Sequence, residues 1–194
     1  MSHYRKSLSA FFPAYHPSAG HKTFFVEKVW SACGYQTGSM LVALNCDRIK
    51  SLDSKLTLSH VMDFYEDISA TVFKTCIPKL HTIREGHKVK VGDTIDFFVW
   101  SGLPYRTPQI VVTPKIEVKK VWDFDFKLVH GNSRWYINGT CISDSNPRGT
   151  WFNAGILEEI AKNDGLDLSE MLEWFQYPKP FSGQIICWAD SVKY

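Results

Sequence analysis

The spacing of hydrophobic residues changes several times along the chain, and each spacing predicts a type of element. Apolar side chains recur every three or four positions over residues 59–74, which predicts an amphipathic helix. Shorter helices are expected over Phe24 to about Trp30, Asn153–Lys162 and Leu168–Phe175. We expect Thr23 to cap the first of these and Asp167 the last, because both residue types favour the position before a helix.

Short runs of β-branched and aromatic residues predict strands. These are expected near Met40–Leu44, within Ile77–Glu85, where a loop enters a short strand, and over Thr94–Trp100, Ile110–Thr113 and Gly183–Trp188. Within Lys115–Val129, aromatic and acidic residues alternate, which is typical of a strand with one buried face. Arg134–Ile142 predicts a hairpin that turns at Asn138-Gly139, a favoured dipeptide for tight turns.

Short, mainly antiparallel strands flanked by helices indicate the α+β class, and we expect them to close into a small β-barrel. With 194 residues, one domain over residues 1–194 is expected. Its segments at about 33–76 and 130–152 are treated as insertions.

The composition excludes several classes of protein. Hydrophobic residues make up 44% and charged residues 22%, which is typical of a globular chain. The longest apolar stretches fall well short of the roughly 20 residues of a membrane helix, and the first residues do not resemble a signal peptide. The 5 cysteines are odd in number and include no Cys-x-x-Cys pair. We therefore expect free thiols, a cytoplasmic protein, and no metal, cofactor or membrane partner.

The net charge of +2 conceals an asymmetry. Residues 1–130 contain 17 Lys and Arg against 12 Asp and Glu, a charge of +5, whereas residues 131–194 contain 5 against 8, a charge of −3. The basic residues are densest over 74–90, where His81 and His87 lie among them. This segment is either an ordinary solvated loop or a surface that faces phosphate groups.

Several motifs in this order resemble the ASCH domain of the PUA-like superfamily, particularly its phage-encoded members. They are Lys79-Leu80-His81-Thr82-Ile83-Arg84, then Val91-Gly92-Asp93, then Asn163-Asp164-Gly165-Leu166 before a helix, and finally Phe181–Trp188. The opening residues from Phe12 to Phe25 also resemble it. The core of the resemblance covers roughly 77–128 and 156–194, less than half of the chain.

The resemblance implies a PUA-like barrel with a cleft for RNA or a modified nucleoside. Some family members are similar to acetylcytidine amidohydrolases, and by that likeness Lys79, Thr82 and Asp164 would be catalytic. Arg84 matches the arginine of the motif, and His81, Lys88 and Lys90 are further candidates for substrate binding. This chain has Asp where those enzymes have Glu, a side chain one methylene shorter.

The residues support that chemistry with one reservation about geometry. A threonine hydroxyl needs a base before it can attack an amide, and a lysine can serve when burial and a nearby cation such as Arg84 lower its pKa. However, residues three apart on a regular strand face opposite sides, so Lys79 and Thr82 share a pocket only if the chain bends. Pro78 favours such an irregular segment. Otherwise Lys79 is a surface charge and Thr82 an ordinary strand residue.

Three classes of function therefore stay open. The first is catalysis, either hydrolysis of an amide on a modified cytidine or ribonuclease activity, and the second is a reader of RNA without catalysis. The third is a protein-interaction module whose partner surface is the 59–74 helix. The sequence does not contain the glycine-rich phosphate loop, the His-Glu-x-x-His motif or the Gly-x-Ser-x-Gly motif.

Overall fold

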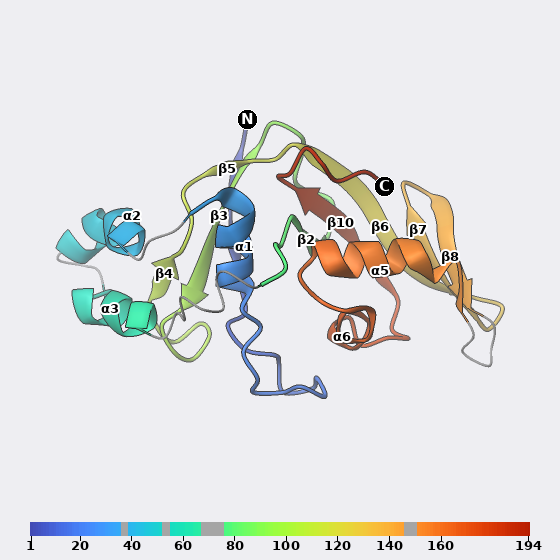
Figure 1. The fold of residues 1–194 in the computed structure, drawn as a ribbon, viewed down its shortest axis with the longest axis horizontal. Coiled ribbons are helices and arrows are strands. Elements are labelled where there is room, and N and C mark those ends of the chain that lie inside the picture. The colour runs from blue at the N-terminus through green and yellow to red at the C-terminus, as the bar shows by residue number, and fades with distance from the viewer. Residues whose placement is uncertain (36–38, 52–54, 67–75, 146–150) are drawn as a thin grey trace.

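The computed structural model describes residues 1–35, 39–51, 55–66, 76–145 and 151–194 (Figure 1). The helices are α1 (Phe25–Cys33), α2 (Ser39–Lys50), α3 (Leu58–Glu66), α5 (Ala154–Asn163) and α6 (Leu168–Trp174). The strands are β1 (His3–Ser7), β2 (His81–Glu85), β3 (Thr94–Trp100), β4 (Gln109–Val111), β5 (Ile116–Glu117), β6 (Lys120–Val129), β7 (Asn132–Ile137), β8 (Thr140–Ser145), β9 (Trp151–Phe152) and β10 (Phe181–Cys187). The predicted α+β class is confirmed.

The first sheet is built around β3, whose five central residues are all buried. β1 pairs with it in parallel, so that His3 lies opposite Thr94 and Ser7 opposite Phe98. β4 pairs with β3 antiparallel, and the short β5 joins the start of β3. A strand that is buried on both faces has a nearly continuous run of apolar residues. This is why β3 could be predicted from the sequence.

The second sheet is antiparallel, in the order β2-β10-β6-β7-β8-β9. Phe124 and Phe126 of β6 are fully buried, which confirms the alternation seen in the sequence, although Leu128 is half exposed. Asn138 and Gly139 both adopt positive φ, at 48° and 79°. These are the angles that the tight turn between β7 and β8 requires, so the predicted hairpin is confirmed.

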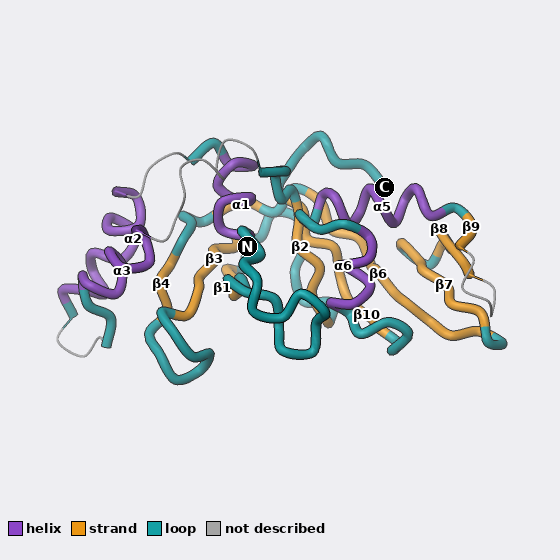
Figure 2. The backbone as a smooth tube through the Cα atoms, turned by 60° about the horizontal axis from the view of Figure 1, so that its bottom comes forward, coloured by secondary structure: helices purple, strands orange, loops and turns teal. Residues whose placement is uncertain are grey.

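The predicted barrel is not found. The described strands form two separate sheets that lie side by side, and α1 packs against the first sheet (Figure 1, Figure 2). Within the described residues no ladder of backbone hydrogen bonds joins the two sheets, and such a ladder is what closes a barrel. β1 and β2 are instead the outermost strands of their sheets, and a side-chain contact described below connects them.

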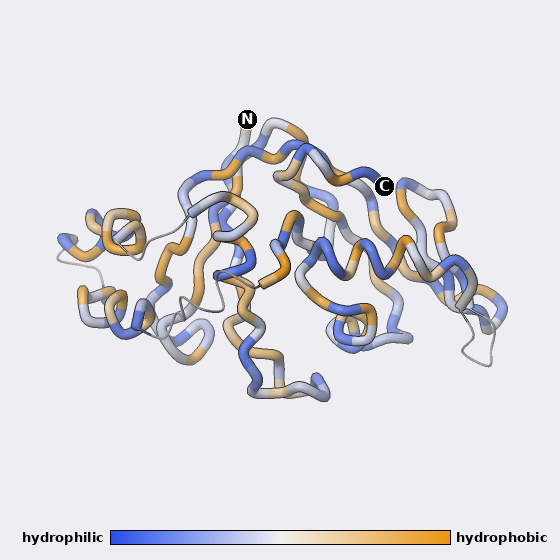
Figure 3. The backbone as a smooth tube through the Cα atoms, in the orientation of Figure 1, coloured by the Kyte–Doolittle hydropathy of each residue, from blue (hydrophilic) through white to orange (hydrophobic). Residues whose placement is uncertain are grey.

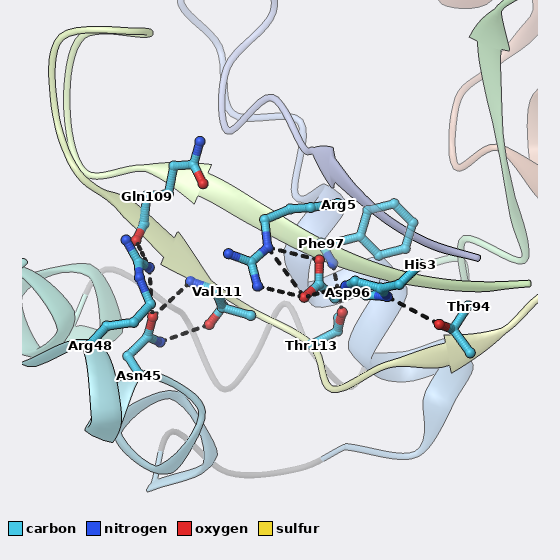
Figure 4. Close-up of polar contacts among 10 residues, drawn as sticks. All are labelled: His3, Arg5, Asn45, Arg48, Thr94, Asp96, Phe97, Gln109, Val111 and Thr113. Carbon is cyan, nitrogen blue, oxygen red and sulfur yellow. Dashed lines mark hydrogen bonds and ion pairs between the residues drawn. The ribbon is translucent and has the colours of Figure 1, made fainter. Parts of the chain in front are cut away.

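The strand expected at Met40–Leu44 is wrong, since these residues lie in α2. The reason is the next residue, Asn45. The Asn45 side-chain amide donates to the Val111 carbonyl at 2.9 Å, and its oxygen accepts from the Val111 N–H at 3.0 Å (Figure 4). Asn45 thereby pairs with the free edge of β4 as another strand would. Arg48, one turn later, donates to the Gln109 carbonyl, so α2 covers this edge.

The first sheet also carries an ion pair on its β1 side. The Arg5 guanidinium donates to both carboxylate oxygens of Asp96, with distances of 2.9 and 2.8 Å for its shortest two bonds (Figure 4). This pairing fixes the register of β1 against β3, because the two residues lie directly opposite each other. β1 was not predicted, because its sequence is mostly polar.

The other helices agree with the sequence within a residue or two. The predicted cap at Asp167 is confirmed, because Asp167 forms a complete capping box with Glu170. Thr23 is not the N-cap of α1, a position that Phe24 occupies, although Thr23 accepts a hydrogen bond from the Phe25 N–H at 3.2 Å. Hydrophobic and hydrophilic residues alternate along α5 (Figure 3), which buries Leu157, Ile160 and Ala161. The helix predicted over 59–74 is present as α3 up to Glu66. Residues 67–74 lie outside the described part of the chain.

The face of α3 that was expected to bind a partner protein contains both buried and exposed residues. Val61 is fully buried, whereas Met62 and Tyr65 are 39% and 41% exposed. Ile68 and Val72 lie outside the described residues. Across the described helices, none is long and apolar enough to cross a membrane.

Candidate functional site

Lys79 and Leu80 form an irregular connection between three elements. The Lys79 N–H donates to the Lys28 carbonyl of α1 at 3.0 Å, and the Leu80 N–H donates to the Asn163 carbonyl of α5 at 2.8 Å. The Leu80 carbonyl accepts from the Trp188 N–H at 3.3 Å. The predicted irregular segment after Pro78 is therefore present, and it points the Lys79 side chain toward the end of α5.

Lys79 and Asp164 form a buried ion pair. The Lys79 Nζ lies 2.5 Å from Asp164 Oδ1 and also donates to the Asp164 carbonyl at 2.6 Å. The two side chains are only 1% and 9% exposed. The Phe25 ring covers the ammonium, with 4.3 Å from Nζ to the ring centre, a favourable cation–π distance. Two residues predicted to act together are thus in direct contact.

His81 extends this pair into a small polar network. Its Nδ1 lies 3.5 Å from Asp164 Oδ1, and its Nε2 lies 2.9 Å from the Tyr194 hydroxyl. Asn163 Nδ2 donates to the same hydroxyl at 2.8 Å, so the hydroxyl hydrogen is available to His81 Nε2. With the imidazole hydrogen on Nδ1, that nitrogen faces the Asp164 carboxylate, but it forms no hydrogen bond among the described residues.

Burial and charge act in opposite directions on these groups. Burial lowers the pKa of Lys79 to about 8, although the charge and hydrogen bond of Asp164 work to raise it. Burial would raise the pKa of the Asp164 carboxyl, but Lys79 and His81 more than compensate and lower it. The pKa of His81 is lowered by burial. At neutral pH the site therefore holds an ammonium, a carboxylate and a neutral imidazole.

Thr82 is not part of this network. It lies on β2 opposite Ile186 and is 3% exposed. Because it follows His81 directly on a strand, its side chain faces the opposite side of the sheet. Among the described residues, no hydrogen bond joins its hydroxyl to Lys79 or Asp164. The structure thus brings together Lys79, His81 and Asp164, and leaves Thr82 on the other face of β2.

Arg84 shares the face of Thr82 and reaches the other sheet. Its Nη2 donates to the Ser7 carbonyl of β1 at 2.6 Å, while its buried Nε has no partner among the described residues. Burial lowers the pKa of Lys6, and the charges of Arg84 and Lys88 lower it further. Lys6, Arg84 and Lys88 therefore form a basic cluster on β1, β2 and the following loop.

The remaining predicted binding residues lie beside this cluster. Lys88 is exposed, and its carbonyl accepts from the Tyr4 hydroxyl at 2.9 Å. Lys90 is also exposed, and its N–H donates to Asp93 Oδ2 at 3.0 Å. Hydrogen bonds from the backbone N–H groups of Ser2 and Lys90 lower the pKa of Asp93, and the charge of Lys90 adds to this effect. Lys88 thus belongs to the basic cluster, whereas Lys90 is oriented by the turn before β3.

A cavity of about 960 Å³ lies next to these groups. Its walls come from the end of β1, the following loop, the first turn of α1, α3, and the end of β3 with its loop. It is rich in aromatic rings, and its aromatic lining consists of Phe11, Phe12, Tyr15, Phe24, Phe25, Phe64, Trp100 and Tyr105. Ser7 and Phe25 also line it, and they are the residues that contact Arg84 and Lys79. The predicted site residues thus lie behind the cavity wall.

Sequence reasoning missed Glu27, which lines the same cavity and is 7% exposed. A signal was present, because Glu27 is the acidic residue of α1 and directly follows the apolar pair Phe25 and Val26. Lys28 was missed as well; its Nζ donates to the Gly165 carbonyl at 2.5 Å. Among the described residues, no cluster of side chains suited to hold a metal ion is found.

Comparison of the chain with protein-family models, with curated proteins and with solved structures gives no match. The resemblance to the ASCH domain therefore stays a prediction, and the site has to be interpreted from its own chemistry.

Proposed function

We propose that this protein binds RNA or a modified nucleoside, with a base in the aromatic cavity and phosphate groups at the basic cluster. The observation that carries the proposal is the bond from Arg84 to the Ser7 carbonyl. Ser7 lines the cavity, so this bond holds a guanidinium directly behind the cavity wall. A stacking surface next to positive charges is the usual combination for binding single-stranded nucleic acid.

The proposal also gives a reason for the electrostatic repulsion within the basic cluster. Lys6, Arg84 and Lys88 repel one another, and a bound phosphate would relieve that repulsion. A PUA-like arrangement, as the ASCH resemblance implies, remains part of the proposal. The likeness of Lys79–Arg84 to the ASCH motif favours the same class of ligand.

The test is binding of a short single-stranded RNA, followed by fluorescence anisotropy at several salt concentrations. We expect Lys6→Ala and Lys88→Ala to weaken binding and to make its salt dependence shallower by about one unit of slope each. Lys119→Ala is the matched control, because this exposed lysine pairs with Glu117 at 2.7 Å. Failure to bind RNA or nucleosides, or an affinity independent of salt, would contradict the proposal.

A second candidate is hydrolysis of an acetyl amide on cytidine. The observation that favours it is the pKa of about 8 for Lys79, since a lysine close to neutrality can exchange protons during catalysis. In this proposal Thr82 Oγ attacks the amide carbonyl, and its proton passes to Lys79 in the deprotonated form, which is the minor form at neutral pH. The C–N bond then breaks, and the same proton moves from Lys79 to the departing amine.

Water would next hydrolyse the acetyl-threonine ester, which gives acetate and restores Thr82. Asp164, ionised at neutral pH, would keep Lys79 in place and assist proton transfer. The geometry demands that β2 bends or that the substrate reaches both faces, because Thr82 lies opposite His81. Thr82→Ala should keep nucleoside binding and abolish release of acetate from acetylcytidine. Unchanged turnover would exclude threonine as the nucleophile.

A further inference from the structure

Glu27 is a buried carboxylate that lacks an external partner. It is 7% exposed and lines the aromatic cavity from the first turn of α1. Among the described residues, no other side chain or backbone group forms a hydrogen bond with it. Burial raises the pKa of the Glu27 carboxyl, although its own N–H and the charges of Lys22 and Lys28 act to lower it. A buried carboxylate without partners is costly, so its presence calls for a ligand.

Ser101 provides a second polar group with unused bonding capacity in the same cavity. Its Oγ is enclosed and has no partner among the described residues. An ionised carboxylate offers two acceptors, and a serine hydroxyl offers one donor. The cavity wall therefore holds two acceptors and one donor among its aromatic rings, and neighbouring atoms cover the donor.

The cavity wall also contains strained backbone. Phe24 and Tyr105 adopt positive φ, at 55° and 62°, although neither is glycine. Both residues line the cavity. Such conformations persist where the surrounding structure enforces them, and they concentrate at binding sites.

From these observations we infer that the cavity selects guanine, with Glu27 accepting from the base and Ser101 donating to it. This inference rests on the proposed function. The Watson–Crick edge of guanine carries two adjacent donors, N1–H and N2–H, followed by the acceptor O6. That order complements one carboxylate and one hydroxyl. Adenine and cytosine each present a single donor group there, and uracil presents one donor between two acceptors.

The guanine could belong to a free nucleotide or to an RNA strand, since both offer the same edge. The basic cluster behind Ser7 would receive a phosphate in either case. A guanidinium group, as in an arginine side chain, also matches a carboxylate. It has no acceptor for the Ser101 hydroxyl, which favours guanine.

The test compares GMP, AMP, CMP and UMP by isothermal titration calorimetry, and the pentanucleotides UUGUU and UUAUU by anisotropy. We expect the wild type to prefer GMP and UUGUU. Glu27→Gln should weaken GMP binding roughly 10- to 100-fold, the range for losing one bidentate base contact. The same variant should retain AMP binding or strengthen it, because an amide presents the donor and acceptor that adenine needs. Ser101→Ala should weaken GMP binding several-fold.

Glu158→Gln is the matched control, because Glu158 is an exposed carboxylate on α5, away from the described lining of the cavity. It should leave GMP affinity unchanged, and the thermal unfolding midpoint of Glu27→Gln verifies that the variant is folded. Tighter binding of UUGUU than of GMP identifies RNA as the source of the base, and the reverse identifies the free nucleotide.

Three results would overturn the inference. Equal binding of all four nucleotides would remove guanine selection yet leave the proposed function intact. A guanine preference that survives in Glu27→Gln would show that Glu27 does not read the base. Tighter, Glu27-dependent binding of N-acetyl-arginine amide would assign the site to a guanidinium group. If neither nucleotides nor oligonucleotides bind, the proposed function itself fails.

Discussion

The ammonium of Lys79 and the carboxylate of Asp164 lie 2.5 Å apart, although 85 residues separate them along the chain. Their contact joins the segment before β2 to the end of α5. Both side chains are buried, so each one depends on the other for its charge. Breaking such a pair by removing one partner leaves an uncompensated charge inside the protein.

Asp164→Asn should therefore lower the free energy of unfolding by about 3 kcal/mol. The loss is measured by urea denaturation at pH 7. Glu117→Gln breaks the exposed pair with Lys119 and should leave stability almost unchanged. A loss below about 1 kcal/mol for Asp164→Asn would mean that the buried pair contributes no more than a surface pair.

Lys79 should also make stability depend on pH in the alkaline range. Between its folded pKa of about 8 and its ordinary value of 10.5, the unfolded chain holds a proton that the folded chain has released. The contribution of Lys79 to the free energy of unfolding then rises with pH, by up to about 1.4 kcal/mol per unit. Below pH 8 both states are protonated, and this dependence disappears.

Lys79→Met should remove that rise. The difference in unfolding free energy between wild type and variant should change in favour of the wild type from pH 8 to pH 10.5. Denaturation of both proteins at several pH values tests this, because the other titrating groups cancel in the difference. A difference that stays constant over this range would show that Lys79 keeps its ordinary pKa.

Gly183 determines how closely β10 approaches β2. A Cβ atom at this position would lie 2.2 Å from the Arg84 carbonyl oxygen, a distance that backbone atoms cannot accommodate. Gly183→Ala should destabilise the fold by about 1–3 kcal/mol and displace the strand that carries Arg84. It should weaken RNA binding as well.

Gly155→Ala is the control for that change. Gly155 lies in α5, and a Cβ there meets no atom within 4 Å. The substitution should stabilise the protein by up to about 1 kcal/mol, since alanine favours a helix more than glycine does. Equal effects of the two substitutions would argue against a close approach at Gly183.

The hydroxyl of Tyr194 should stabilise the polar network. It bonds to both His81 and Asn163, while its ring packs 5.0 Å from the Trp122 ring centre. Tyr194→Phe keeps the ring and removes both bonds, which should cost about 1–3 kcal/mol. Tyr65→Phe, at an exposed tyrosine, should change stability by less than about 0.5 kcal/mol. Equal denaturation midpoints would show that water replaces the hydroxyl.

Periodicity predicted the elements whose burial pattern is strong. Sequence patterns were sufficient to predict β3, the β7–β8 hairpin and the capped α6, because the signals for these elements are local. α2 was not, because an apolar run as short as Met40–Leu44 fits a strand or a helix equally well. What decides it is Asn45, whose bonds to β4 depend on residues 66 positions away.

In the candidate site too, features with a local signal could be predicted, and contacts between distant residues could not. The contact between Lys79 and Asp164 was expected from the motif, and the i, i+3 argument correctly warned that Thr82 might face away. The involvement of His81 through Asp164 and Tyr194 could not be read from spacing, since it depends on the position of the last strand and the residues after it. Glu27 was overlooked because its environment is set by α3 and β3, which are distant in sequence.

Arg84 has a consequence for solubility as well. β1 and β2 are the outermost strands of their sheets, and unpaired strand edges invite addition of strands from other molecules. By donating to the Ser7 carbonyl, Arg84 fastens one edge against the other inside a single molecule. The same guanidinium thus protects the protein against edge-to-edge aggregation, and self-association would accompany its loss.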